Sequence, residues 1–255
     1  MSTTYLITGA NRGLGRAAVE KYLSRDNVTV IATVRDPAHS TAKSLSSLST
    51  GSNSKLIVLS LDSTEFDPAK LTKTLTQDHG IETLDVVVSN AGICQAAGPI
   101  AQVQLKDLTH HIETNAYGPL ALFQATVSLL DKSPNPKFIA IGSPLGSTGG
   151  MERRAMYPLS VYGASKALAH HFVRRIHFEH PRITAFVVDP GFVQTDMGNA
   201  GAQAHGFEKA FDEVEPTIVE TVRLIDAATK KEHSGRFIPT GKTSVVEMEG
   251  EDFPW

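Results

Sequence analysis

The sequence has one cysteine, few aromatic residues and no excess of charge of one sign. A single cysteine, Cys94, among 255 residues cannot form an internal disulfide, which excludes a disulfide-stapled fold. The 24 lysine and arginine residues against 27 aspartate and glutamate residues leave a net charge of −3, so we expect no nucleic-acid partner. No apolar run approaches the roughly 18 residues of a spanning helix, and the first residues do not resemble a signal peptide. These absences predict a cytoplasmic protein that binds a small molecule and no membrane.

Short β-branched apolar runs alternate with segments of helical period. This alternation predicts an α/β fold with a doubly wound parallel sheet of seven strands and helices on both faces. We expect a single domain over residues 1–255, because such folds reach about 250 residues as one unit. The predicted strands are Tyr5–Thr8, Val28–Val34, Lys55–Leu61, Leu84–Ser89, Lys137–Gly142, Ile183–Val188 and Gly235–Ile238. The predicted helices run from Gly13 to about Ser24, onward from Asp36-Pro37, and over about 65–79, 102–131, 161–180 and 215–231.

Two segments do not follow the alternation. Residues 143–160 and 192–214 are rich in Gly, Ser, Met and aromatic residues, and each follows a predicted strand. Doubly wound sheets bind ligands beyond the carboxyl ends of their strands. We therefore expect these two loops to form the walls of the substrate site, although their apolar residues could equally belong to a core or a subunit interface.

A glycine-rich turn joins the first predicted strand to the first predicted helix. It reads Gly9-Ala10-Asn11-Arg12-Gly13-Leu14-Gly15. Glycines at such a turn let a pyrophosphate approach backbone amides at the positive end of the helix dipole. The order of strand, glycine turn and helix predicts a dinucleotide site that includes Gly9, Asn11, Arg12, Gly13, Leu14 and Gly15.

The end of the second strand indicates which dinucleotide binds. An NAD-selective site would place an acidic residue there to bind the ribose hydroxyls, but the chain has Val34 followed by Arg35. Arg35 and Arg12 together suit a 2′-phosphate, so we predict NADP(H) as the cofactor. Asp36 precedes Pro37 and is interpreted as a helix cap. Either arginine could instead be a solvated surface charge.

Tyr162 and Lys166 lie four residues apart, on one face of the helix predicted over 161–180. A carbonyl oxygen that receives a hydride at its carbon becomes negative and needs a proton. A free phenol with a pKa of about 10 donates poorly near neutrality, and a neighbouring cation would lower that pKa. The pair therefore suits carbonyl reduction, although a tyrosine and a lysine at this spacing also occur by chance.

Taken in order, these motifs resemble the short-chain dehydrogenase/reductase superfamily, and more narrowly fungal NADPH-dependent ketone reductases. The resemblance extends over residues 3 to about 240 and implies a Rossmann-type fold. It implies that Asp62-Ser63 and Asn90-Ala91-Gly92 border the cofactor, and that Pro190, Gly191, Val193 and Thr195 orient its nicotinamide. Asp62 could instead cap a turn, and Ser89 replaces a frequent asparagine before Asn90.

The resemblance also implies the roles of the reacting residues. Ser143 would bind the substrate carbonyl, with Ser147 as the fallback and Gly142 in place of a frequent serine. Asn115 would interrupt a long helix and hold a water joined to Lys166, or it is simply a polar residue beside the kink at Pro119. The predicted catalytic set is therefore Asn115, Ser143, Tyr162 and Lys166.

The expected function is NADPH-dependent reduction of a ketone, on a hydrophobic or aromatic small molecule. The alternative is a catalytically silent NADP-binding regulator or scaffold; an epimerase or dehydratase would resemble longer chains. Relatives imply a homodimer or homotetramer built on the helices at 102–131 and 161–180. Adjacent histidines point to different helix faces, so we expect surface or interface roles for them and no metal site. The acidic and aromatic ending, Glu247–Trp255, could be mobile or could anchor on a neighbouring subunit.

Overall fold

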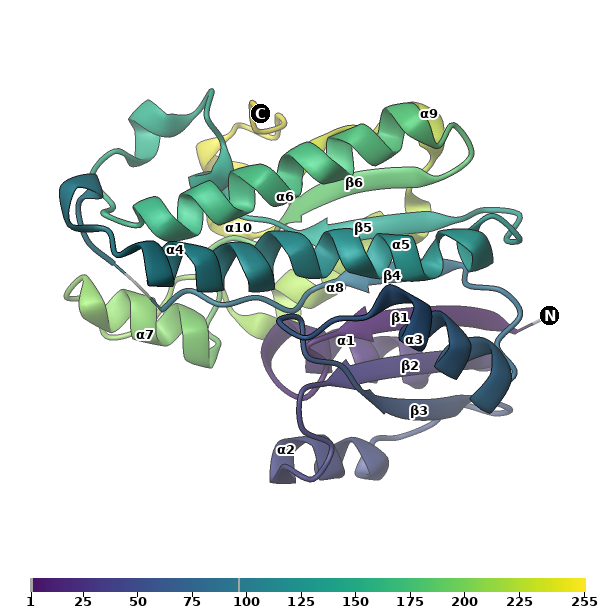
Figure 1. Cartoon of the computed structure of the whole chain (residues 1–255). Helices are drawn as coiled ribbons and strands as arrows, with labels where there is room; N and C mark the ends of the chain where they lie inside the picture. The colour runs from purple at the N-terminus through teal and green to yellow at the C-terminus, as the bar shows by residue number, and fades with distance from the viewer. Residues whose placement is uncertain (1, 96) are drawn as a thin grey trace.

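The described residues, 2–95 and 97–255 of a computed structural model, contain one parallel sheet of seven strands (Figure 1). Its strand order is β3-β2-β1-β4-β5-β6-β7, which confirms the predicted doubly wound sheet. The strands are β1 (Thr3–Thr8), β2 (Val28–Val34), β3 (Lys55–Ser60), β4 (Val86–Ser89), β5 (Lys137–Ile141), β6 (Thr184–Asp189) and β7 (Phe237–Pro239). Because the chain changes winding direction between β1 and β4, a crevice opens beyond their carboxyl ends.

Helices cover both faces of this sheet. In Figure 1, α4, α5 and α6 cross in front of the strands, while α1 and α8 lie behind them. The helices are α1 (Gly13–Leu23), α2 (Ser40–Lys43), α3 (Pro68–Lys73), α4 (Leu105–Ile112), α5 (Gly118–Leu130), α6 (Ser160–Glu179), α7 (Asp196–Ala204), α8 (Val214–Ala227), α9 (Lys230–His233) and α10 (Lys242–Glu247). Among those of the described residues, none combines the length and apolar character that a bilayer crossing requires.

Alternate residues of each strand enter two separate hydrophobic cores. Leu6 of β1 packs with Leu122 of α5 in the front core, whereas its neighbour Ile7 packs with Val19 of α1 and Ile218 of α8 in the rear core. Successive side chains of a strand point to opposite faces, so a strand covered on both faces must be apolar at nearly every position. This is why the short β-branched runs locate the strands so well.

The start of the second helix was predicted wrongly. Asp36 and Pro37 do not begin it: the Asp36 carboxylate accepts a hydrogen bond from the Ala38 N–H and closes a turn. Helix α2 starts at Ser40, and His39 caps it by accepting from the Thr41 N–H. An Asx turn and a helix cap have the same local signature, since both need a short polar acceptor two residues before a free N–H.

The long helix predicted over 102–131 is divided. A π-helical turn, Glu113–Tyr117, separates α4 from α5, and Asn115 lies within it. The predicted interruption at Asn115 is therefore confirmed. The expected helix over 65–79 likewise ends in a π turn, Thr74–Asp78, and that over 215–231 breaks between α8 and α9. The segment 192–214, expected as a loop, contains α7.

Candidate active site

The turn between β1 and α1 contains glycines whose conformation or surroundings disfavour a side chain. Gly9 and Gly13 have φ of +64° and +55°, a conformation that favours glycine. A Cβ atom at Gly15 would lie 2.4 Å from both the Gly9 carbonyl oxygen and Asn90 Nδ2. The turn is therefore held tightly against β4, and the backbone of α1 lies close to the end of the sheet.

The amino-terminal end of α1 has free N–H groups. Within the described residues, Arg12 precedes the helix in an extended conformation without a side-chain cap, and the first turn has no acidic residue. Free N–H groups at the positive end of a helix dipole bind phosphate. The turn thus fits the pyrophosphate of a dinucleotide, held by the backbone from Gly9 to Gly15.

Asn90 joins β4 to the glycine turn. Its Nδ2 donates to the carbonyl oxygens of Thr8 and Gly9 at 2.8 and 3.3 Å, and the Thr8 hydroxyl accepts from the N–H groups of Asn90 and Ala91, each at 3.0 Å. The serine that precedes Asn90 therefore leaves this hydrogen bonding intact. These contacts place Asn90, Ala91 and Gly92 beside the crevice.

The arginines expected to select the cofactor are exposed. Arg35 follows β2 on the surface, and Arg12 lies 3.5 Å from the Asp196 carboxylate of α7. An exposed pair of this kind contributes about 0–1 kcal/mol, so it does not hold Arg12 in place. Asp62 accepts from the N–H and hydroxyl of Thr64 at 2.9 and 2.7 Å, which lowers its pKa; it caps a turn, and its place beside the cofactor stays a prediction. Its neighbour Ser63 packs against Gly118.

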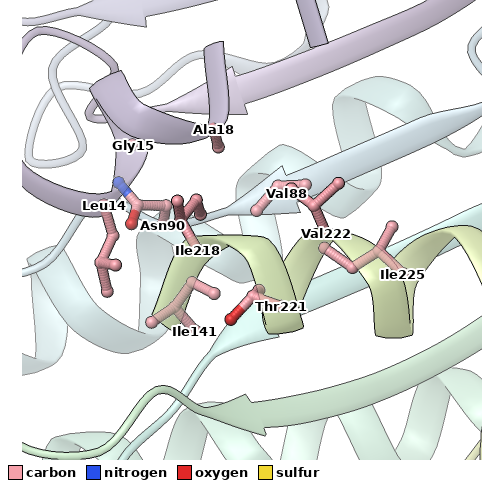
Figure 2. Close-up of a pocket in the computed structure, with 10 residues that line it drawn as sticks. All are labelled: Leu14, Gly15, Ala18, Val88, Asn90, Ile141, Ile218, Thr221, Val222 and Ile225. Atoms are coloured by element: carbon pink, nitrogen blue, oxygen red, sulfur yellow. The ribbon is translucent and has the colours of Figure 1, made fainter. Parts of the chain in front are cut away.

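A small cavity lies behind the glycine turn, between α1, the sheet and α8 (Figure 2). Its volume is about 10 Å³, room for one water molecule at most. Leu14, Gly15, Asn90, Ile141 and Ile218 are among the residues that line it. Since this lining is almost wholly apolar and the cavity is so small, it is a gap in the rear core and not a ligand site.

The reacting residues meet at the carboxyl ends of β4 and β5. Tyr162 and Lys166 lie on α6, and Ser143 follows β5. Lys166 Nζ lies 5.8 Å from the centre of the Tyr162 ring and donates to the Ile141 carbonyl oxygen at 2.8 Å. The Ser143 hydroxyl lies close enough to the phenol to lower its pKa. Sequence-distant residues are thus brought together as expected, and each is at least nine-tenths buried.

Asn115 supports this group from the π turn. Its amide Nδ2 donates to the Ile93 carbonyl and to Ser165 Oγ, both at 2.9 Å, and its Oδ1 accepts from the Ile93 N–H at 2.8 Å. Ser165 in turn donates to the Tyr162 carbonyl at 2.7 Å. The side chain therefore ties the segment after β4 to the first turns of α6, between Tyr162 and Lys166.

The electrostatics differ from the expectation in one respect. Burial raises the pKa of Tyr162 above its ordinary value, and Ser143, not Lys166, opposes this rise. The expected lowering by the lysine is therefore not found in this arrangement, in which the Lys166 Nζ donates to the Ile141 carbonyl oxygen. Burial lowers the pKa of Lys166 to about 8. A phenol that stays protonated near neutrality is a proton donor, as reduction requires.

Cys94 lies beside the same two residues. It is half-buried, burial raises its pKa, and Lys166 opposes that rise. The thiol is therefore uncharged near neutrality.

Ser147, the fallback for Ser143, is occupied elsewhere: its hydroxyl donates to the Pro254 carbonyl and accepts from the Gly150 N–H. Ser143 is thus the serine that faces the phenol.

The segment after β6 is held by a carboxylate that the sequence analysis did not single out. Asp212, 4% exposed, accepts hydrogen bonds from the Phe192 N–H at 2.9 Å and from the N–H of Thr243 at 3.0 Å, and also from the Thr243 hydroxyl. A Cβ atom at Gly191 would lie 2.3 Å from Asp212 Oδ2. Asp212 is distant in sequence from both partners, so no local pattern indicates this role.

The histidines correct another expectation. His111 and His170 are 1% and 3% exposed, so surface roles are wrong for them, while His110 and His171 are exposed. His111 Nδ1 donates to the Asp107 carbonyl at 2.8 Å and Nε2 accepts from the Gln95 N–H at 3.1 Å. Within the described residues, His, Cys, Asp and Glu form no group of three suited to a metal ion.

Comparison with known proteins identifies the fold and its family. The sequence profile of the family described as short chain dehydrogenase matches residues 3–205. The chain belongs to the short-chain dehydrogenase family. This short-chain dehydrogenase is 41% identical to norsolorinic acid ketoreductase of Dothistroma septosporum, over 99% of its own length and 92% of that protein. It is 39% identical to norsolorinic acid ketoreductase of Aspergillus parasiticus, over 99% and 91%.

Solved structures agree with this assignment. The short-chain dehydrogenase superposes on NADPH-bound carbonyl reductase from chicken fatty liver with a TM-score of 0.81, 26% identity and full coverage of both chains. Carbonyl reductase Sniffer of D. melanogaster gives a TM-score of 0.81 at 25% identity, again over both whole chains. The predicted fold and family are confirmed, and the relatives agree with the prediction of an NADPH-dependent ketone reductase.

Proposed function

We propose that this short-chain dehydrogenase reduces a ketone to an alcohol with NADPH. The observation that carries the proposal is the meeting of Ser143, Tyr162 and Lys166 at the end of a crevice whose other end fits a pyrophosphate. A catalytically silent regulator would need the glycine turn but not this buried reacting group. The ketoreductase and carbonyl reductase names of the relatives support the same activity.

The cofactor is proposed to lie along the crevice. The glycine turn would hold its pyrophosphate, Arg12 and Arg35 its 2′-phosphate, and Asp62-Ser63 and Asn90-Ala91-Gly92 its adenosine and ribose side. The nicotinamide would be oriented by Pro190, Gly191, Val193 and Thr195, and its ribose bound by Lys166. NADPH, when bound, supplies the hydride.

The protein contributes binding, polarisation and a proton. Ser143 donates a hydrogen bond to the substrate carbonyl oxygen and Tyr162 transfers its phenolic proton to that oxygen as negative charge develops. Once its Nζ turns from the Ile141 carbonyl to the cofactor ribose, the Lys166 ammonium stabilises the tyrosinate that remains. Asn115 ties the π turn to α6 and, with a water, returns a proton from solvent to Tyr162.

The substrate is proposed to be a hydrophobic or aromatic ketone. Exposed Phe207 and Phe211 stack edge to face, 5.1 Å between ring centres, and Phe211 stacks on Phe192 at 5.5 Å. Tyr157 of the other loop contacts His205 at 5.5 Å, so segments 143–160 and 192–214 meet. Two aromatic-rich walls beyond the strand ends suit a flat, apolar ligand.

The assembly and location are further parts of the proposal. We place the protein in the cytoplasm as one catalytic domain over 1–255 that forms a homodimer or homotetramer. Leu105 of α4, Tyr117 of the π turn and Phe178 of α6 are 79%, 53% and 63% exposed, which suits an interface of these helices. Light scattering after size-exclusion chromatography would test this: a monomer for the parent protein contradicts the assembly.

The activity is tested by NADPH consumption with a panel of aliphatic and aromatic ketones. Tyr162→Phe should lower the rate by about 10²–10⁴-fold, the usual contribution of a positioned proton donor, while NADPH still binds. Tyr5→Phe, in β1 and stacked on Tyr22 away from the reacting residues, is the matched control and should keep both. NADPH binding without consumption across the panel would favour the regulator, and full turnover by Tyr162→Phe would refute the assignment.

A further inference from the structure

His170 lies beneath the loop that carries Ser143. It follows Lys166 by one helical turn on the same face of α6, and it is 3% exposed. A Cβ atom at Gly142 would lie 2.6 Å from its Nε2, and one at Gly146 would lie 2.8 Å from its Cε1. Val187 Cγ1 would lie still closer to a Cβ atom at Gly142, at 2.3 Å, so the imidazole and Val187 together leave no room for a side chain at the position where a serine was expected.

Among residues 2–95 and 97–255, the ring makes one polar contact, and that contact is with Ser143. The Ser143 N–H donates to His170 Nε2 at 3.4 Å, and the Ser143 hydroxyl accepts from the Leu145 N–H at 3.3 Å at the start of the turn Pro144–Gly146. A nitrogen that accepts cannot carry a proton, so in the neutral ring the proton is on Nδ1. Among the described residues, Nδ1 has no hydrogen-bond partner.

The ring is held by aromatic neighbours from distant parts of the chain. Its centre lies 4.6 Å from that of Phe237 and 6.5 Å from that of Trp255. The Trp255 carbonyl accepts from the Gly149 N–H at 2.8 Å and from the Thr148 hydroxyl at 3.1 Å. The loop is thus bounded on one side by His170 and on the other by the last residues of the chain.

We propose that His170 is a positioning residue for Ser143, whose buried N–H it accepts. The contact sets the backbone conformation from which the Ser143 hydroxyl reaches the substrate carbonyl. A buried N–H without an acceptor is unfavourable, so loss of Nε2 would shift the Ser143 backbone toward another partner. A shift of about 1 Å at a group that binds the reacting atoms can cost about a hundredfold in rate.

Two variants separate the acceptor from the shape of the ring. His170→Leu removes the acceptor, and His170→Gln keeps one near the place of Nε2. Because the inference rests on the proposed function of Ser143, both are made in the parent protein and in Ser143→Ala. We expect His170→Leu to lower kcat/KM for the ketone about tenfold or more in the parent and less than about twofold in Ser143→Ala. His170→Gln should stay within about threefold of the parent, and the NADPH dissociation constant should be unchanged throughout.

The outcomes are distinct. An equal loss of kcat/KM in both backgrounds would show that His170 is merely structural and would overturn the inference. In that case the loss of activity caused by Ser143→Ala alone would still support the proposed function. Full activity of Ser143→Ala would refute the proposed role of Ser143 and with it the inference.

A second measurement, made on the parent protein, tests the inference even where a variant does not fold. Nitrogen-15 NMR of the parent should find His170 neutral with its proton on Nδ1 from about pH 5.5 to 8, where an ordinary histidine changes its charge. A proton on Nε2 would be incompatible with acceptance from Ser143 and would overturn the inference.

Discussion

The N–H of Gly149 donates to the carbonyl oxygen of Trp255 at 2.8 Å. This contact joins the last residue to the loop that follows Ser143. The Phe253 N–H donates to the Phe237 carbonyl at 2.9 Å, so the residues just before Trp255 lie against β7. The ending of the chain is therefore bound to its own active-site loop and is not the free tail that its composition allowed.

Trp255→Ala should weaken both the fold and substrate binding. The indole stacks on Phe237 at 6.0 Å and lies 4.8 Å beneath the Arg174 guanidinium. Since the ring is only half-buried, we expect a loss of about 2 kcal/mol, which lowers the Tm by about 4–8 °C in a chain of this length. KM for the ketone should rise because the loop is less ordered. Val246→Ala, 70% exposed on α10, is the control in thermal melts and should change neither value.

Reduction should slow as the pH rises through about 8. The pKa of Lys166 is lowered to about 8 by burial, so its charge is present below that pH and is lost above it. Without the ammonium the tyrosinate is not stabilised. The quantity to measure is kcat/KM for NADPH between pH 6 and 10, roughly two pH units on each side of the Lys166 pKa. This ratio reports the pKa values of the enzyme before the cofactor binds. The residual activity of Lys166→Arg, whose charge persists, should not fall near pH 8.

Asp212→Asn should weaken cofactor binding. An amide has one acceptor oxygen in place of two and presents an N–H₂ group to one of the donors of Phe192 or Thr243. An unpaired buried donor costs about 1–3 kcal/mol, and the segment from Pro190 to Thr195 should lose order. We expect the NADPH dissociation constant, measured by fluorescence, to rise about tenfold. Glu213→Gln, at the exposed neighbour, should leave it unchanged; an equal effect of both would contradict the assignment.

Arg35→Ala should reduce the preference for NADPH over NADH. A charged hydrogen bond to the 2′-phosphate contributes about 1.5–3 kcal/mol, so kcat/KM for NADPH should fall about tenfold or more while that for NADH stays nearly constant. Arg25→Ala provides the control, because Arg25 lies at the amino ends of the strands and pairs with Asp226 at 2.7 Å. An equal loss with both cofactors would argue against a phosphate contact.

Stability should fall in acid because of His170. Burial, and then the charge of Lys166, lowers the His170 pKa to about 3, whereas the unfolded chain has the ordinary value of 6.5. Between these values the unfolded state binds more protons, so the free energy of unfolding decreases as the pH falls from 6.5 to 3, by at most about 1.4 kcal/mol per pH unit. Asp189, whose pKa is raised to about 6, contributes the opposite slope between 3.8 and 6.

Denaturant unfolding at a series of pH values tests this. His170→Gln should lose stability less steeply below pH 6.5 than the parent protein. His171→Gln, at the exposed neighbouring position, should follow the parent curve. An unchanged slope in His170→Gln would mean that the imidazole is not held neutral.

The elements that the sequence predicted well are those whose signal is local. Each strand is a short apolar run because both faces of the sheet are covered, and the glycine turn is recognisable because its two positive φ angles admit few other residues. Tyr162 and Lys166 follow from helical spacing alone. Where two local structures have the same signature, as at Asp36, the prediction was wrong.

The sequence by itself determined the parallel sheet, the glycine turn and the face of α6 that carries Tyr162 and Lys166, since periodicity and short spacing are properties of neighbouring residues. Only the tertiary structure decided that Asp212 holds the segment after β6, that His170 meets the Ser143 N–H, and that Trp255 closes the loop. It also decided the direction of the pKa shifts of Tyr162 and Lys166, because desolvation depends on how segments far apart in the chain bury a side chain together.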